Sequence, residues 1–181
     1  MLRLNPNFCR VMLTSMTTSP KTQSLNDNDF RRPIDDRYFE DYVAGEVYEY
    51  GYRTVTQDEI IAFAQQFDPQ SIHTDPVAAM QGPFSGIIAS GWHSAGILMR
   101  LFADHYLSHV ASLASPGIDE LRWTTPLRPA DELWLRTTII ETRPSRSKFD
   151  RGLVTTRAEL INAENDKVMS ILAMNILQRR N

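Results

Sequence analysis

The feature that most constrains the fold is a helical segment that begins near Ser90 and is apolar on almost every side. Only a narrow polar stripe remains, formed by Arg100, Asp104 and Ser108. A helix that is apolar nearly all round is buried on most of its surface. The rest of the chain therefore has to supply a large surface that wraps around this helix.

That surface is predicted in the second half of the chain, which reads as sheet after Pro116. Four β-prone runs alternate with turn residues, at 117–124, 131–142, 151–162 and 167–177. Alternating β-branched and aromatic residues favour strands, and short polar connections between them are typical of antiparallel hairpins. We predict a meander of antiparallel strands.

The segment before the buried helix predicts one further strand, at 47–55, followed by two helices. Thr56 is a suitable N-cap for the first helix, with Glu59 at the capping-box position. This helix ends at Asp68, because a proline follows. A second, short helix is expected at 75–80. One strand, an interior helix and a run of antiparallel strands give an α+β class.

Length and composition fit one folded domain with an N-terminal extension. The chain has 181 residues, which suffices for one sizeable core but not for two. Its contents of 42% hydrophobic and 23% charged residues are ordinary for a globular protein. Residues 1–36 lack apolar periodicity, so we predict a disordered tail there and a domain at 37–181.

Two interpretations of the tail remain open. It has basic residues but no acidic residue before Asp27 and is rich in Ser, Thr and Asn, which resembles a mitochondrial transit peptide. Alternatively the start is over-long, because Met12 or Met16 could begin the chain. We favour the second interpretation, with the cytoplasm as the expected location.

Charge and cysteine content narrow the functions. A formal net charge of -3 gives no general attraction to nucleic acid or to anionic membranes. Cys9 is the only cysteine, so no intramolecular disulfide and no cysteine-based metal site can form, and a reducing compartment is expected. No apolar run reaches the roughly 18 residues that could span a membrane. No histidines and carboxylates share a metal-ligand spacing, so we predict no metal and no cofactor.

Two short segments can supply acid–base chemistry beside a carbonyl-binding site. Asp68 and His73 lie five positions apart in a segment broken by Pro69 and Pro76, so both side chains can face one pocket and share a water. Gly91 starts the buried helix, where free backbone N–H groups and the macrodipole can hold an oxygen that gains negative charge. Because Asp68 ends a helix, whose dipole opposes ionisation there, we predict a raised pKa for it.

These residues resemble the hydratase motif of the MaoC-like dehydratases, which include the (R)-specific enoyl-CoA hydratases. The resemblance rests on the Asp68-x4-His73 spacing, on Asp75-Pro76, and on Gly91 eighteen positions beyond His73. Without it, Asp68 and Asp75 would be interpreted as ordinary turn and cap residues.

The resemblance extends over about residues 38–177 and carries specific expectations. It implies a hot-dog fold, in which an antiparallel sheet wraps the long helix, and a homodimer. It implies that Asp68 and His73 activate a water, and that the N–H of Gly91 binds the oxygen of a thioester.

The motif departs from the family pattern at two places. Gln70-Ser71 stands where Asn-Pro is usual, and Phe67 stands where Gly is usual. The amide function is kept at Gln70, but the rigid turn of proline is lost. Gln70 and Ser90 are candidates for contact with the substrate.

A basic cluster lies in one predicted loop, where Arg143, Arg146, Lys148 and Arg151 are opposed only by Asp150. Such clusters are common at solvated hairpin tips, and we favour that interpretation. The alternative is contact with the phosphates of coenzyme A, for which Arg146 and Lys148 are the candidates.

The other histidines are expected to be structural. His93, in the first turn of the buried helix, is predicted to have a structural role rather than a catalytic one. His105 and His109, near the end of that helix, are predicted at the surface, where cations are favoured.

Three functions remain open. The first is reversible hydration of a trans-2-enoyl thioester to a 3-hydroxyacyl thioester, on coenzyme A or acyl carrier protein. The second is a hot-dog acyl thioesterase, and the third is a non-catalytic acyl-binding relative. The Asp68 and His73 pair with Gly91 favours the hydratase, because thioesterases of this fold more often rely on a single carboxylate.

Overall fold

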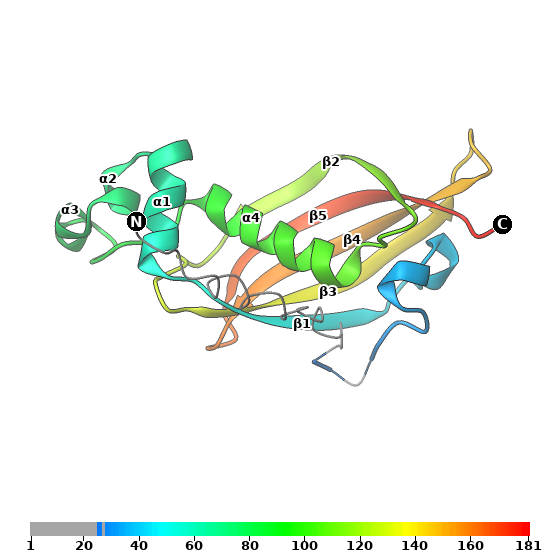
Figure 1. Cartoon of the computed structure of the whole chain (residues 1–181), viewed down its shortest axis with the longest axis horizontal. Helices are drawn as coiled ribbons and strands as arrows, with labels where there is room; N and C mark the ends of the chain where they lie inside the picture. The colour runs from blue at the N-terminus through cyan, green and yellow to red at the C-terminus, as the bar shows by residue number, and fades with distance from the viewer. Residues whose placement is uncertain (1–24, 27) are drawn as a thin grey trace, which may run out of the picture.

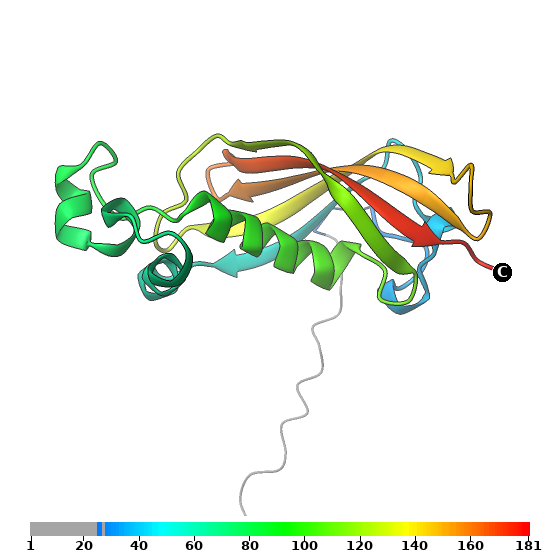
Figure 2. The same cartoon turned by 90° about the horizontal axis from the view of Figure 1, so that it is seen from above.

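The structure of the protein is a computed structural model that describes residues 25, 26 and 28–181. Five strands form one antiparallel sheet in the order β1-β3-β4-β5-β2, and helix α4 lies along one face of it (Figures 1 and 2). The strands are β1 (Val47–Thr54), β2 (Ser112–Trp123), β3 (Glu132–Pro144), β4 (Arg151–Asn162) and β5 (Lys167–Gln178). The predicted α+β class, with a sheet wrapped around a helix, is confirmed.

The helices lie where the sequence patterns predict them, with one addition. They are α1 (Gln57–Phe67), α2 (Ser71–Thr74), α3 (Pro76–Gln81) and α4 (Gly91–Leu101), which continues into the π-helical turn η3 (Phe102–Tyr106). The single turn α2 was not predicted. Two short 3₁₀ segments, η1 (Ile34–Asp36) and η2 (Phe39–Asp41), precede β1. None of the helices in the described residues is long and apolar enough to cross a membrane.

The core lies between α4 and the sheet. Ile97, Leu98 and Leu101 of α4 are buried against sheet residues such as Leu133 and Leu135. This burial explains why the helix is so apolar. One side of the helix is nevertheless open in the single chain, since the side chains of Trp92 and Met99 are exposed.

The strand order corrects the predicted simple meander. Strands β3, β4 and β5 do pair in succession, but β2 pairs with β5 at the far edge of the sheet and not with β3. The connection after β2 therefore crosses from one part of the sheet to another. Alternation of apolar residues determines which face of a strand is buried, but it does not determine the neighbouring strand. Strand β2 also begins at Ser112, earlier than predicted.

The packed part of the chain begins before the predicted boundary at residue 37. Phe30 is buried, with its ring stacked on that of Tyr48 at 4.0 Å and the guanidinium of Arg37 at 3.6 Å from its centre. Asn28 donates a hydrogen bond to the carbonyl of Val47 at 2.9 Å. A lone aromatic among polar residues has no periodicity, so sequence patterns could not find this contact. Residues 1–24 and 27 of the predicted tail lie outside the described residues.

Candidate functional site

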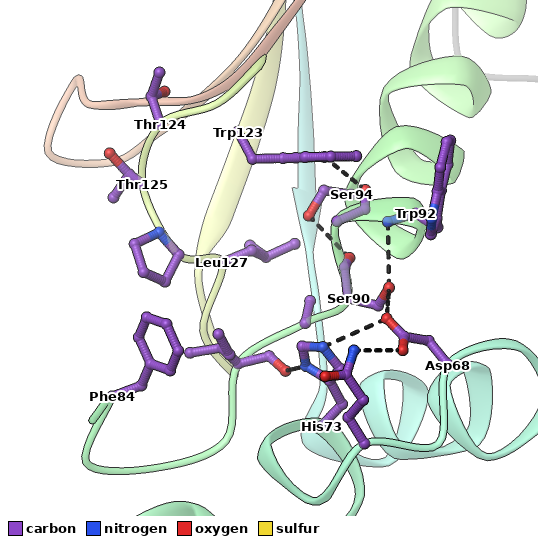
Figure 3. Close-up of a pocket in the computed structure, with 15 residues that line it drawn as sticks. Asp68, His73, Phe84, Ser90, Trp92, Ser94, Trp123, Thr124, Thr125 and Leu127 are labelled. Carbon is purple, nitrogen blue, oxygen red and sulfur yellow. Dashed lines mark hydrogen bonds and ion pairs between the residues drawn. The ribbon is translucent and has the colours of Figure 1, made fainter. Parts of the chain in front are cut away.

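Asp68 is held at a fixed corner where α1 ends. The predicted capping box of Thr56 and Glu59 starts the helix, and the N–H of Asp68 donates its last hydrogen bond, to Ala64 at 2.8 Å. Pro69 cannot continue the helix, and Asp68 leaves helical geometry with a φ of -154°. The carboxylate is thereby directed into a pocket beside the start of α4 (Figure 3).

His73 lies on α2 with its ring oriented by the backbone. Its Nδ1 is 2.7 Å from the carbonyl oxygen of Ile88, and the side chain is buried. A carbonyl oxygen can only accept, so Nδ1 carries the proton, and in the neutral ring Nε2 is left as an acceptor. This Nε2 lies 3.5 Å from Oδ2 of Asp68 (Figure 3). The two acceptors are close enough to receive both hydrogens of one water molecule.

Two donors hold the carboxylate of Asp68. The side-chain amide of Gln70 donates to Oδ1 at 2.7 Å, and the hydroxyl of Ser90 donates to Oδ2 at 2.7 Å. These bonds, first that of Gln70 and then that of Ser90, lower the pKa of Asp68 below its ordinary value, while partial burial acts against them. The predicted raised pKa is therefore wrong. The two side-chain donors, which the helix-end argument did not include, lower the pKa of Asp68 instead.

Removing the donor on Gln70 should raise the pKa of Asp68. The folded-state pKa lies below the unfolded value, so Asp68 contributes stability above its ordinary pKa that is lost as pH falls through the lowered value. Gln70→Leu should move the titration of the Asp68 carboxyl carbon, followed by NMR, to higher pH and make this contribution smaller. Gln66→Leu, at an exposed position of α1, is the matched control. An unchanged Asp68 titration in Gln70→Leu would contradict the assignment.

Ser90 links the carboxylate to the start of α4. It is the N-cap of this helix, and its Oγ accepts from the N–H of Trp92 at 3.3 Å while donating to Asp68. The hydroxyl hydrogen is therefore directed at Asp68 and not at the open part of the pocket. Ser90 and Gln70 were expected as contacts for the substrate. Both lie in the wall of the pocket, and both donate hydrogen bonds to the carboxylate of Asp68.

Gly91 is the first residue of α4 and lines the same pocket. Its N–H belongs to the first turn, where no intrahelical acceptor exists, and no other acceptor for it occurs in the described part of the chain. Its carbonyl accepts from Nε1 of Trp123 at 2.8 Å. A Cβ atom at this position would lie 2.5 Å from the indole of Trp123, so only glycine fits beneath this ring. The residue pattern of the predicted strand at 117–124 gave no indication that Trp123 contacts Gly91.

The pocket has a volume of about 490 Å³, within the usual range for a small-molecule site. Asp68 and His73 lie next to each other in it (Figure 3), Gly91 also lines it, and the rest is mainly apolar. Trp92 and Trp123 border it as an edge-to-face pair with ring centres 5.5 Å apart, and both rings are largely exposed. The further walls are Phe84, Ile88, Ala89, Pro126 and Leu127, with Ser94, Thr124 and Thr125. This arrangement can hold an acyl group beside a water and a free backbone donor.

Arg146 and Lys148 are not brought to this pocket within one chain. They lie between β3 and β4, on the hairpin at the opposite end of the sheet from α1, α2 and α3 (Figure 1). Both are exposed, as the preferred interpretation of a solvated hairpin tip expects. The geometry of the single chain does not support their alternative role as contacts for coenzyme A.

The remaining histidines lie outside the pocket. His93 is buried with its ring stacked on Phe63 at 4.7 Å, and burial lowers its pKa. This agrees with a structural role. His105 was predicted at the surface, but it is half-buried and stacks on Tyr50, while His109 is exposed. In the described residues no group of three or more His, Cys, Asp or Glu could hold a metal ion.

Known proteins resemble this chain in sequence and in structure. Uncharacterized protein YdeM of Bacillus subtilis is 29% identical over 129 residues, which are 71% of this chain and 90% of that protein. 3-Hydroxyacyl-thioester dehydratase Z of Mycobacterium tuberculosis is 37% identical over 76 residues, 41% of this chain and 50% of that protein. The crystal structure of a MaoC-like dehydratase from Rhodospirillum rubrum has a TM-score of 0.75 and 36% identity, covering 80% of this chain and 99% of that one.

The fold is shared more widely than the sequence. The R-hydratase PhaJ1 of Pseudomonas aeruginosa superposes with a TM-score of 0.61 at 22% identity, covering 80% of this chain and 86% of that one. Such a match shows the fold alone, and the fold is the hot-dog fold. The model of the MaoC like domain matches residues 41–163, which include every residue of the candidate site. The protein therefore belongs to the family of MaoC-like domains.

Proposed function

We propose that the protein hydrates a trans-2-enoyl thioester to a 3-hydroxyacyl thioester, and dehydrates the product in reverse. The observation that carries this proposal is the pair of acceptors, Asp68 Oδ2 and His73 Nε2, 3.5 Å apart in a pocket that also contains the free N–H of Gly91. The dehydratase from Mycobacterium tuberculosis, similar over half its length, is named for 3-hydroxyacyl thioesters, which supports the same substrate class here.

In the proposed reaction, the thioester oxygen accepts a hydrogen bond from the N–H of Gly91. The water held by Asp68 and His73 attacks C3 of the enoyl group, and one of its O–H bonds breaks as the C–O bond forms. The electron pair of the C2–C3 double bond moves toward the thioester, so its oxygen gains negative charge. The N–H of Gly91 and the positive end of α4 stabilise that charge. The proton removed from the water is returned to C2, so the reaction is balanced.

Asp68 and His73 have different roles in this proposal. The lowered pKa keeps Asp68 ionised at neutral pH, so the carboxylate can accept the proton of the water. His73 is anchored through Nδ1 to Ile88, so its Nε2 orients the water and shares the proton. Gln70 and Ser90 are positioning residues, because they hold the carboxylate in place.

Incubating the pure protein with crotonyl-CoA, and with longer enoyl thioesters of coenzyme A and of acyl carrier protein, tests this function. Loss of the enoyl absorbance without release of free thiol is the expected result. Release of thiol would instead identify a thioesterase, since the same water could attack the thioester carbon. If the protein catalyses neither reaction with any member of the series, this result would contradict an enzymatic role and would favour an acyl-binding relative.

We further propose that the protein is a homodimer that joins through β2. This strand forms an edge of the sheet, where backbone hydrogen-bonding groups are unpaired. Large apolar side chains are exposed on it and on the neighbouring α4, namely Leu113, Ile118, Trp123, Trp92 and Met99. A second copy could cover this surface through a two-fold axis.

Sedimentation at micromolar concentration should give the mass of a dimer. Ile118→Glu should shift the protein to monomer, because a charge would be buried without a partner. Phe149→Glu is the matched control, since Phe149 is 84% exposed on the hairpin between β3 and β4, and β4 is separated from β2 by β5. A wild-type protein that sediments as a monomer with full activity would contradict the dimer.

A further inference from the structure

A second cavity, of about 270 Å³, lies further along α4. It lies between the end of this helix and η3 on one side and β2 and β5 on the other, and it opens to the surface beside Met99, Leu113 and Ile118. Its walls are mainly apolar and include Met99, Phe102, Ile118 and Ile171. No residue that lines it carries a charge. The cavity is therefore suited to an uncharged group.

One amide interrupts these apolar walls. Strand β5 alternates, and its buried residues Ile171, Ala173 and Leu177 form one row with Asn175. Asn175 is only 5% exposed and lines the cavity. Its Nδ2 atom is buried and has no hydrogen-bond partner among the described residues. A buried amide without a partner destabilises a protein, so binding of a group that pairs with this amide would be favoured.

We propose that this cavity binds the distal part of an acyl group that carries a neutral oxygen function, such as a hydroxyl or a keto group, and that Asn175 forms a hydrogen bond with this oxygen. The inference rests on the proposed function and specifies its substrate class. Gly91 and Met99 are eight residues apart on one helix, which corresponds to about 12 Å along its axis. At this distance, a thioester held at Gly91 whose chain runs along the helix would reach the cavity with its far end and not with its reacting carbons.

The neutral state of the oxygen follows from the lining. A carboxylate would be buried without a cation, because no Lys, Arg or His lines the cavity. An unsubstituted alkyl chain would fill the space but would leave the amide unpaired. A site that offers a buried hydrogen-bonding group discriminates strongly against ligands that lack its counterpart. Chains with a terminal hydroxyl should therefore be preferred over alkyl chains of equal length.

The test compares the wild type with Asn175→Leu on three substrates: crotonyl-CoA, a longer alkyl enoyl-CoA, and the same chain with a terminal hydroxyl. The wild type should prefer the hydroxylated chain at least about tenfold in kcat/KM. Asn175→Leu should lose this preference and should keep its rate on crotonyl-CoA, which is too short to reach the cavity. Met174→Leu, on the opposite face of β5, is the matched control.

A second measurement separates this inference from the proposed reaction. Calorimetric titration with a saturated acyl-CoA that has a terminal hydroxyl reports binding without turnover. Weaker binding to Asn175→Leu than to the wild type is expected, and it would support the site even if no enoyl thioester were hydrated. The inference would be overturned if the wild type hydrates crotonyl-CoA normally but shows no preference for the hydroxylated chain. It would also be overturned if that preference survives in Asn175→Leu. Either result would leave the proposed function intact. The melting temperature of Asn175→Leu should not fall, because leucine fits an apolar row.

Discussion

Replacing Asp68 with Asn should lower kcat for the best enoyl thioester about 10²–10⁴-fold, the usual contribution of one positioned acid–base group. The carboxylate is the group proposed to take the proton from water, and an amide cannot do so. KM should change much less, because Asp68 acts on the water and not on the acyl chain. Steady-state hydration kinetics measure both quantities.

The matched control for this variant is Asp75→Asn. Asp75 caps α3 by accepting from the N–H groups of Val77 and Ala78, and it does not line the pocket. Asparagine is an equally good N-cap, so stability and kcat should remain near those of the wild type. Near-normal hydration by a folded Asp68→Asn variant would contradict the proposed mechanism.

His73→Gln should cause a loss of similar size, and the double variant tests whether the two residues act together. Both are proposed to hold one water, since Nε2 of His73 and Oδ2 of Asp68 are 3.5 Å apart. The double variant should therefore be much less impaired than the product of the two single losses. Fully multiplicative losses would show that the residues act on separate steps. Melting temperatures, measured in parallel, identify losses that come from unfolding.

The second large effect is expected from Gly91→Pro, which should reduce kcat about 10²–10³-fold, the usual loss when one donor to a developing oxyanion is removed. Proline lacks the N–H that is proposed to bind the thioester oxygen. It is otherwise tolerated in the first turn of a helix. Circular dichroism can establish that the variant is folded before its kinetics are measured.

Gly91→Ala is the necessary control, because any side chain at this position meets the indole of Trp123. Alanine introduces the same Cβ atom but keeps the N–H. The difference between the alanine and proline variants therefore reports the contribution of the donor, and the loss that they share reports the displacement of Trp123. Equal turnover in two folded variants would rule out the role of the N–H.

The sequence by itself determined the elements whose causes are local. The capping box at Thr56 and Glu59 and the proline after Asp68 place α1 correctly, because caps and prolines act within one turn of the helix. The apolar segment after Ser90 predicts the central helix, and the alternating runs predict the strands. The resemblance of the Asp68, His73 and Gly91 spacing to the family motif also singled out three residues that line one pocket.

Only the tertiary structure decided what depends on residues distant in the chain. The pairing of β2 with β5, the hydrogen bond from Ser90 to Asp68 and the indole above Gly91 all arise from contacts between separate segments. Asn175 is one polar residue in a strand until the fold places its amide in an apolar cavity. Local patterns encode burial and helix ends, whereas a pKa or an unpaired donor depends on the three-dimensional neighbours, which no periodicity records.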